Sequence, residues 1–277
     1  MATKGKGSME GLARSVTASV IDDFVSMGIP RDAFRTLKIR ATDLRRYKPG
    51  IDGFTTAAMY SNKNETLHIN TEFLEIYLER RKERHGGYFR AALRQYAAHE
   101  LTHRVIDLTV TATEGQRQSN RWKAVFMMNH EAVAYLAAHV IGHSGSYYDR
   151  HIRSNTISNI SLHSSPLETS LSSNPLERRK VTMTVNDILY NVGSIMGDAA
   201  YLGISSEMEL QRQLCAAALM ETDPLNSLAA IAKVAVRSGY VSREAALYYN
   251  AFVYGNEERS VSRALKTIRR REEKEKQ

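Results

Sequence analysis

The chain of 277 residues contains one cysteine, Cys215, and no long apolar run. A single thiol excludes an intramolecular disulfide and a zinc site built from cysteines, so side-chain packing must hold the fold together. No stretch approaches the roughly 20 apolar residues of a membrane span. Charged residues such as Arg14 and Asp22 interrupt the N-terminal segment before it could serve as a signal peptide. The composition therefore predicts a globular, cytoplasmic protein with no membrane partner.

The net charge of +8 is not concentrated in one segment. Short basic runs are spread along the chain, without aromatic residues between them and without a recognisable nucleic-acid-binding motif beside them. These runs are residues 45–46, 80–82, 178–180 and 269–271. The C-terminal residues mix both signs, which is typical of a solvated helical tail or a partner contact. Nucleic-acid binding therefore has little support and stays open only as an alternative.

The most informative segment is His99-Glu100-Leu101-Thr102-His103. Residues four apart lie one turn above each other on a helix, so His99 and His103 can bind one Zn²⁺ ion. Glu100 can then act as the general base that takes a proton from a metal-activated water. Two histidines on a helix can also be an exposed surface feature. The apolar flanks favour the metal site, because a half-buried charged group needs a partner.

A third ligand must come from elsewhere, and Glu131 is the best candidate. It lies in an Ala-rich helical run that begins near Trp122 and ends at Gly142. Ala134 and Ala138 lie near the face of Glu131, and such small side chains allow two helices to approach closely. Three histidines remain alternative ligands, and these are His130, His139 and His143.

The segment before the predicted zinc helix indicates a hairpin followed by a helix. Residues 54–60 and 65–70 are expected strands, joined by a polar turn at residues 61–64. Residues 72–84 are an expected helix, capped by Asn70 or Thr71. An extended peptide could add to the free edge of such a hairpin by main-chain hydrogen bonds. An ordinary structural hairpin is the alternative interpretation.

Residues 99–109 resemble the active-site helix of the gluzincin metallopeptidases, and are close to the thermolysin-like pattern His-Glu-Leu-Thr-His-x-Val-x-Asp-x-Thr. Glu131 and the following alanines are similar to the third-ligand helix of that clan. The layout is also similar to that of the small intracellular ImmA/IrrE-like peptidases. The position four residues after Glu131 departs from the thermolysin-like pattern, since Tyr135 replaces an aspartate. SprT-like DNA-associated proteases share the His-Glu-x-x-His layout as well.

The resemblance implies a zinc-dependent endopeptidase with His99, His103 and Glu131 as metal ligands and Glu100 as general base. It also implies that Asp107 orients a ligand imidazole. A distal His or Tyr would donate a hydrogen bond to the oxyanion. Candidates for that donor are His143, Tyr147, Tyr148 and His151.

The expected fold class is α+β, mostly α: a compact zincin-like domain with a small antiparallel sheet and active-site helices, then an all-α region. We expect a disordered N-terminus at residues 1–9, the zincin-like domain at 10–152 and a Ser-rich linker or loop at 153–181. A helical region at 182–267 and a charged tail at 268–277 follow. The helical region could contact an assembly partner.

Two functions of different classes follow from the sequence. The first is a zinc metallopeptidase that acts on a protein or peptide substrate. The second is a structural or binding component of a larger assembly, in which the zincin fold is kept and its activity is incidental. The first predicts turnover that depends on Glu100, and the second predicts metal without turnover.

Overall fold

The computed structural model describes residues 3–46, 57–80, 86–142, 149–171, 183–204 and 207–254. The chain divides into two compact units. The first comprises Met1–Leu108 and Ala137–Asp149, and the second comprises Thr109–Leu136 and Arg150–Gln277. The division falls inside one continuous helix, α5 (Asn120–Gly142). The first unit is therefore not one unbroken stretch, as the expected domain of residues 10–152 would be.

The first unit contains a mixed sheet of three strands in the order β1-β3-β2. These strands are β1 (Lys38–Thr42), β2 (Ala58–Ser61) and β3 (Thr66–Asn70). β2 and β3 form the predicted hairpin, antiparallel, with Tyr60 opposite Leu67. β1 pairs with β3 in parallel, with Ile39 opposite Leu67. The sheet is therefore mixed, and the expectation of a purely antiparallel sheet was wrong. The sequence did not reveal β1, because this strand pairs with a segment distant in sequence and its residues carry no clear apolar pattern.

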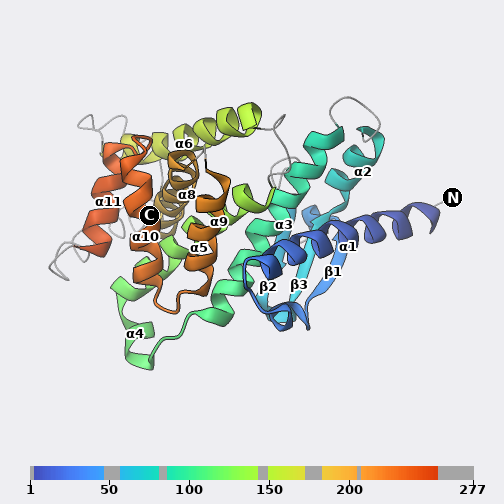
Figure 1. Ribbon diagram of the computed structural model, residues 1–277, viewed down its shortest axis with the longest axis horizontal. Helices are drawn as coiled ribbons and strands as arrows, with labels where there is room; N and C mark the ends of the chain where they lie inside the picture. The colour runs from blue at the N-terminus through green and yellow to red at the C-terminus, as the bar shows by residue number, and fades with distance from the viewer. Residues whose placement is uncertain are drawn as a thin grey trace, which may run out of the picture. The chain divides into compact units, whose positions relative to one another are not determined.

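Three α-helices accompany this sheet, namely α1 (Thr3–Ser26), α2 (Thr71–Arg80) and α3 (Gly86–Thr109). Figure 1 shows α1 lying across the strands, and α1 packs on both β1 and α2. Its apolar residues Ala13, Val16, Val20 and Phe24 are buried at helical spacing. Disorder was expected for residues 1–9, and this was wrong from Thr3 onward, where α1 begins. The later turns of α1 are packed against the protein through these buried residues.

Short 3₁₀ turns complete the first unit, namely η1 (Arg31–Phe34), η2 (Leu44–Arg46) and η3 (Asn62–Asn64). η3 is the predicted polar turn of the hairpin. It ends at Glu65, which has a left-handed backbone (φ 51°). The first strand predicted for the hairpin began at residue 54, and residues 54–56 lie outside the described part of the chain, as do residues 81–85 of the predicted helix.

The described part of the second unit is helical (Figure 1). Its helices are α4 (Glu114–Gln118), the first part of α5, α6 (Asp149–Leu171), α8 (Val185–Gly203), α9 (Met208–Met220), α10 (Pro224–Arg237) and α11 (Arg243–Val253). α8 packs against α10 and α11, and α10 packs against α9. Most described residues between 183 and 254 are thus helical, and the charged tail lies outside the described residues.

Side-chain caps explain where these helices begin. The hydroxyl of Thr184 accepts from the Asp187 N–H while the Asp187 carboxylate accepts from the Thr184 N–H, which is a capping box. Asp223 caps α10, and Pro224 occupies the first turn, where its missing N–H costs nothing. Ser242 caps α11. Local sequence therefore determines these three helix starts.

The expected Ser-rich linker was wrong for residues 153–171, which belong to helix α6. One face of α6 is buried through residues spaced three or four apart, namely Thr156, Ile160, Ser164 and Leu167. Hydroxyls on the other positions donate to carbonyls one turn earlier, as Ser158 does to Ser154 and Ser161 to Ile157. Ser158 and Ser161 are thus tolerated in this helix because their hydroxyls are satisfied within the same helix.

Among the described residues, helix α5 is long and apolar enough to cross a membrane by length and composition. Its most apolar window has a mean hydropathy of 1.2, but 72% of that window is buried inside the protein. Val133, Ala134 and Leu136 have no exposed surface. This degree of burial is typical of a core helix of a folded protein.

The described elements are mostly helices with one small sheet, which confirms the expected α+β, mostly α, fold class.

Candidate metal centre

Helix α3 brings the imidazoles of His99 and His103 together on one side of the helix. Their Nε2 atoms are 3.3 Å apart, and the two rings meet edge to face with centroids 4.9 Å apart. Two nitrogen ligands of a tetrahedral zinc ion, each with a bond of 2.0–2.1 Å, lie about 3.3–3.4 Å apart. The helix period alone therefore sets the two imidazoles at the spacing that one ion requires.

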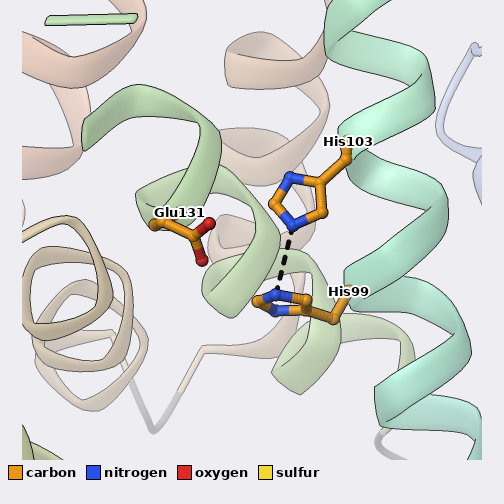
Figure 2. A group of neighbouring side chains, drawn as sticks. All are labelled: His99, His103 and Glu131. Carbon is orange, nitrogen blue, oxygen red and sulfur yellow. Dashed lines mark hydrogen bonds between the residues drawn. The ribbon is translucent and has the colours of Figure 1, made fainter. Parts of the chain in front are cut away.

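Glu131 on α5 completes a group with the two histidines. The ligand atoms of the three residues lie within 4.8 Å of one another, and each side chain is half-buried. Figure 2 shows the imidazoles of His99 and His103 projecting from one helix toward the carboxylate of Glu131 on another. For comparison, the ligand atoms of a tetrahedral zinc ion lie about 3.3 Å apart.

The donor set fits zinc. Two imidazole nitrogens and one carboxylate oxygen are the protein ligands of catalytic zinc sites, which keep a further position for water or substrate. Hard ions such as Mg²⁺ and Ca²⁺ prefer oxygen ligands throughout. The residues present are therefore suited to a zinc ion.

Two of the alternative histidine ligands, His130 and His139, are not part of this group. The ring of His130 packs on Phe126, with centroids 4.3 Å apart. His139 is buried close enough to His99 to influence its titration. His143, Tyr147 and Tyr148 lie outside the described residues. Among the residues described, His99, His103 and Glu131 form the group that could hold a metal ion, and the role of Glu131 as a ligand stays a prediction.

Burial changes the titration of the two adjacent site residues. Desolvation, and then the nearby His139, lower the pKa of His99 to about 4. Its imidazole is therefore neutral near pH 7, which is the form that coordinates metals. Desolvation raises the pKa of Glu100 to about 7, and a hydrogen bond from the Tyr60 N–H opposes this rise. Both shifts follow from the position of these side chains on the half-buried face of α3.

The carboxylate of Glu100 is held by the sheet. Its Oε2 accepts a hydrogen bond of 2.7 Å from the backbone N–H of Tyr60 on β2. The carbonyl of Ala57 accepts a hydrogen bond from the N–H of Asn70, so the main-chain groups of residue 57 point toward β3. Main-chain groups alternate in direction along an antiparallel strand, and those of Ala58 and Tyr60 therefore point away from β3. The free side of β2 is therefore the side that Glu100 meets.

Glu131 is positioned by close contact between helices α5 and α8 in the second unit. A Cβ atom on Gly193 would lie 2.5 Å from the carbonyl oxygen of Met128 and 2.8 Å from Cβ of Glu131. One turn later, a Cβ atom on Gly197 would lie 2.3 Å from the carbonyl oxygen of Ala132. Only glycine fits at these two positions, so the backbone of α8 supports the turn of α5 that carries Glu131.

Tyr135, at the position where the thermolysin-like pattern has aspartate, belongs to a polar cluster. Its hydroxyl lies 2.7 Å from that of Tyr190 and 3.4 Å from Nε2 of His163. Nδ1 of His163 lies 2.6 Å from the side-chain oxygen Oδ1 of Asn191. Because an amide oxygen can only accept, Nδ1 carries the proton of the neutral imidazole and Nε2 is the acceptor. Burial, followed by Tyr190 and nearby carboxylates, raises the pKa of Tyr135 well above its ordinary value. The phenol is therefore neutral and donates to His163.

Asp107 is exposed, and its Oδ2 accepts a hydrogen bond of 2.9 Å from the Asn62 amide in the hairpin turn. This contact ties the end of α3 to η3. The role inferred from the resemblance, in which Asp107 orients a ligand imidazole, stays a prediction.

Sequence reasoning missed the residues that support the site. Tyr60 and Arg104 carried no role in the sequence analysis, and no local pattern marks a contact between residues 44 apart. Gly193 and Gly197 did carry a signal, because two glycines four apart inside an apolar helical run are typical of close helix packing. That spacing could have identified α8 as a partner of another helix.

The geometry of the site is the evidence for its chemistry, because comparison with known proteins adds none. No protein-family profile, no curated protein and no solved structure matches this chain.

Proposed function

We propose that this chain is a zinc-dependent endopeptidase of the gluzincin type, with His99, His103 and Glu131 as the zinc ligands and Glu100 as the general base. The observation that carries this proposal is the group of His99, His103 and Glu131, whose ligand atoms lie within 4.8 Å of one another, with Glu100 between the two histidines in sequence. The zincin-like fold is part of the proposal.

The chemistry divides between the metal and the chain. A zinc ion held by these ligands would supply Lewis acidity, which makes water nucleophilic near neutral pH and polarises a carbonyl group. Glu100 takes the proton of the attacking water and passes it to the departing amine. The hydrogen bond from Tyr60 uses Oε2, so Oε1 is the oxygen that accepts this proton.

The sheet supports the binding of an extended peptide. β2 is an edge strand of the described sheet, and its outer main-chain groups belong to Ala58 and Tyr60. Ala58 is 3% exposed, whereas Met59, Tyr60 and Ser61 are half-buried. A peptide that adds to this edge would therefore pair with the carbonyl of Tyr60, since the N–H of Tyr60 is used by Glu100.

The test is a metal assay combined with digestion of a peptide library. X-ray fluorescence of the purified chain should find about one zinc per chain, and chelation should stop digestion. Glu100→Gln should retain the zinc and lower kcat by at least roughly 100-fold, because general acid–base catalysis contributes about 10²–10⁴-fold.

Glu168→Gln is the matched control for this experiment. It makes the same chemical change at an exposed position of α6, and it should digest the library as the wild type does. Equal digestion by the wild type and Glu100→Gln would refute the peptidase proposal. Bound zinc without any turnover would favour a structural or binding protein instead.

A further inference from the structure

Tyr60 is held at two points by residues one turn apart on α3. Its backbone N–H donates to Oε2 of Glu100 at 2.7 Å, and its hydroxyl accepts from Nη1 of Arg104 at 2.7 Å. The guanidinium carbon of Arg104 also lies 5.8 Å from the centroid of the Tyr60 ring. Since Glu100 and Arg104 are four residues apart, they share one face of α3. A single strand residue thus connects the proposed general base with a buried cation.

Arg104 is fixed from several sides and is 4% exposed. Its Nε donates to the carbonyl of Ala33 at 2.8 Å, and its Nη2 donates to the hydroxyl of Thr36 at 2.9 Å. Nη1, which holds Tyr60, also lies 3.3 Å from a carboxylate oxygen of Glu65. All three guanidinium nitrogens therefore have partners, and the planar fork of arginine allows no other orientation that keeps them.

Glu65 joins this network from the hairpin turn. A hydrogen bond from Thr36, together with Arg104, lowers the pKa of its carboxyl. Glu65 is the one described residue other than glycine with a positive φ, and this conformation places it directly between η3 and β3. The turn that precedes β3 and the segment that precedes β1 are consequently linked to α3 through the same guanidinium group.

We propose that Arg104 and Tyr60 are positioning residues for the general base. Arg104 sets the lateral position of β2 against α3 through the Tyr60 hydroxyl, and this places the Tyr60 N–H where it holds one oxygen of Glu100. A glutamate side chain has three rotatable torsions, so a fixed donor for Oε2 selects one orientation and leaves Oε1 for the reacting water. The inference rests on the proposed function, because it assigns these residues to the same reaction.

Hydrogen exchange at the Tyr60 amide tests the positioning without requiring any activity. This N–H points away from β3 and its acceptor is Glu100, so it should be protected in the wild type and lose that protection in Glu100→Ala. In Tyr60→Phe and Arg104→Lys, exchange at residue 60 should accelerate by roughly tenfold or more, because the contact that positions β2 is broken. The amide of Ile69, which faces β1 on the other side of the central strand, should exchange as before.

Arg94→Lys is the matched control. Arg94 is another largely buried arginine of α3, bound to Ser19, Asp23 and the carbonyl of Ile141 but not to Tyr60. This variant should leave exchange at residue 60 unchanged. Equal acceleration in Arg94→Lys, or no acceleration in either Tyr60→Phe or Arg104→Lys, would overturn the proposal.

Kinetics then connect the positioning to catalysis. With a fluorogenic peptide library as the probe and zinc content equal to that of the wild type, Tyr60→Phe and Arg104→Lys should lower kcat roughly tenfold and leave KM nearly unchanged. A rise in KM with unchanged kcat would contradict the proposal. If the zinc-loaded wild type cleaves no peptide, the proposed function fails, and the exchange measurements still decide whether Arg104 and Tyr60 position Glu100.

Discussion

Helices α3 and α5 hold the residues proposed as metal ligands and general base by different means. In the first unit, the side chains on α3 are held by directed hydrogen bonds, from Tyr60 to Glu100 and from Arg104 to Tyr60. In the second unit, Glu131 is held by steric fit, because α8 contacts the backbone of α5 at two glycines. The first kind of support depends on particular polar groups, and the second depends on the absence of side-chain atoms.

This difference predicts different sensitivities. A conservative change of a polar residue in the first unit should alter the orientation of Glu100 and leave the helices intact. Adding one methyl group at the α5–α8 contact should move a helix, because a packed interior has no room for it.

The largest effect should come from removing one of the proposed zinc ligands. His103→Ala and Glu131→Gln should each weaken zinc binding by at least roughly 100-fold, which exceeds the loss that follows from removing an outer partner. Competition with a chelating dye measures the affinity. His130→Ala is the control, since His130 precedes Glu131 but packs on Phe126, and its zinc affinity should stay near that of the wild type. Unchanged affinity in Glu131→Gln would show that Glu131 is not a ligand.

Gly193→Ala should produce the next largest effect. The new Cβ would lie 2.5 Å from the Met128 carbonyl oxygen, and such overpacking should lower the free energy of unfolding by about 1–3 kcal/mol. Zinc affinity should fall as well, because the second nearest atom is Cβ of Glu131. Urea unfolding and the dye assay measure the two effects.

Gly11→Ala provides the control for that experiment. A Cβ on Gly11 meets no atom within 4 Å in the interior of α1. The substitution should therefore raise the free energy of unfolding by up to about 1 kcal/mol, because alanine has the higher helix propensity. If Gly193→Ala were equally stabilising, steric fit could not be what positions Glu131.

A smaller loss should follow Tyr135→Phe. The change removes the hydroxyl that contacts Tyr190 and His163, and leaves the buried ring in place. One such hydrogen-bonding group contributes about 1 kcal/mol to the free energy of unfolding. Urea unfolding measures the loss, and a decrease as large as that of Gly193→Ala would mean that polar contacts hold the second unit as strongly as packing does.

The smallest effect concerns Cys215, which has no exposed surface on α9. Burial raises the pKa of its thiol to about 12, so at pH 8 almost none of it is the reactive thiolate. An aromatic disulfide reagent should modify the native chain far more slowly than the chain in guanidinium chloride. Rapid modification of the native chain would show that the second unit opens easily and is not tightly packed.

Much of the local structure could be predicted from the sequence. The helix predicted for residues 122–142 is found at 120–142, and the hairpin at residues 58–70 has the predicted strands and turn. Strong periodicity and a polar turn between two apolar segments were sufficient for these predictions. β1 and α6 were not predicted, since one is a polar strand that pairs with a distant partner and the other is rich in serine.

The placement of His99 and His103 on one side of α3 follows from local sequence, because the period of an α-helix relates residues four apart regardless of what surrounds them. The Ala-rich run around Glu131 also indicated this residue as the third candidate. How these groups are held depends on tertiary contacts. The contact between Tyr60 and Glu100 joins residues 40 apart, and the fit of Gly193 against Met128 and Glu131 joins two helices. Such contacts depend on how whole elements pack, which no local pattern of residues specifies.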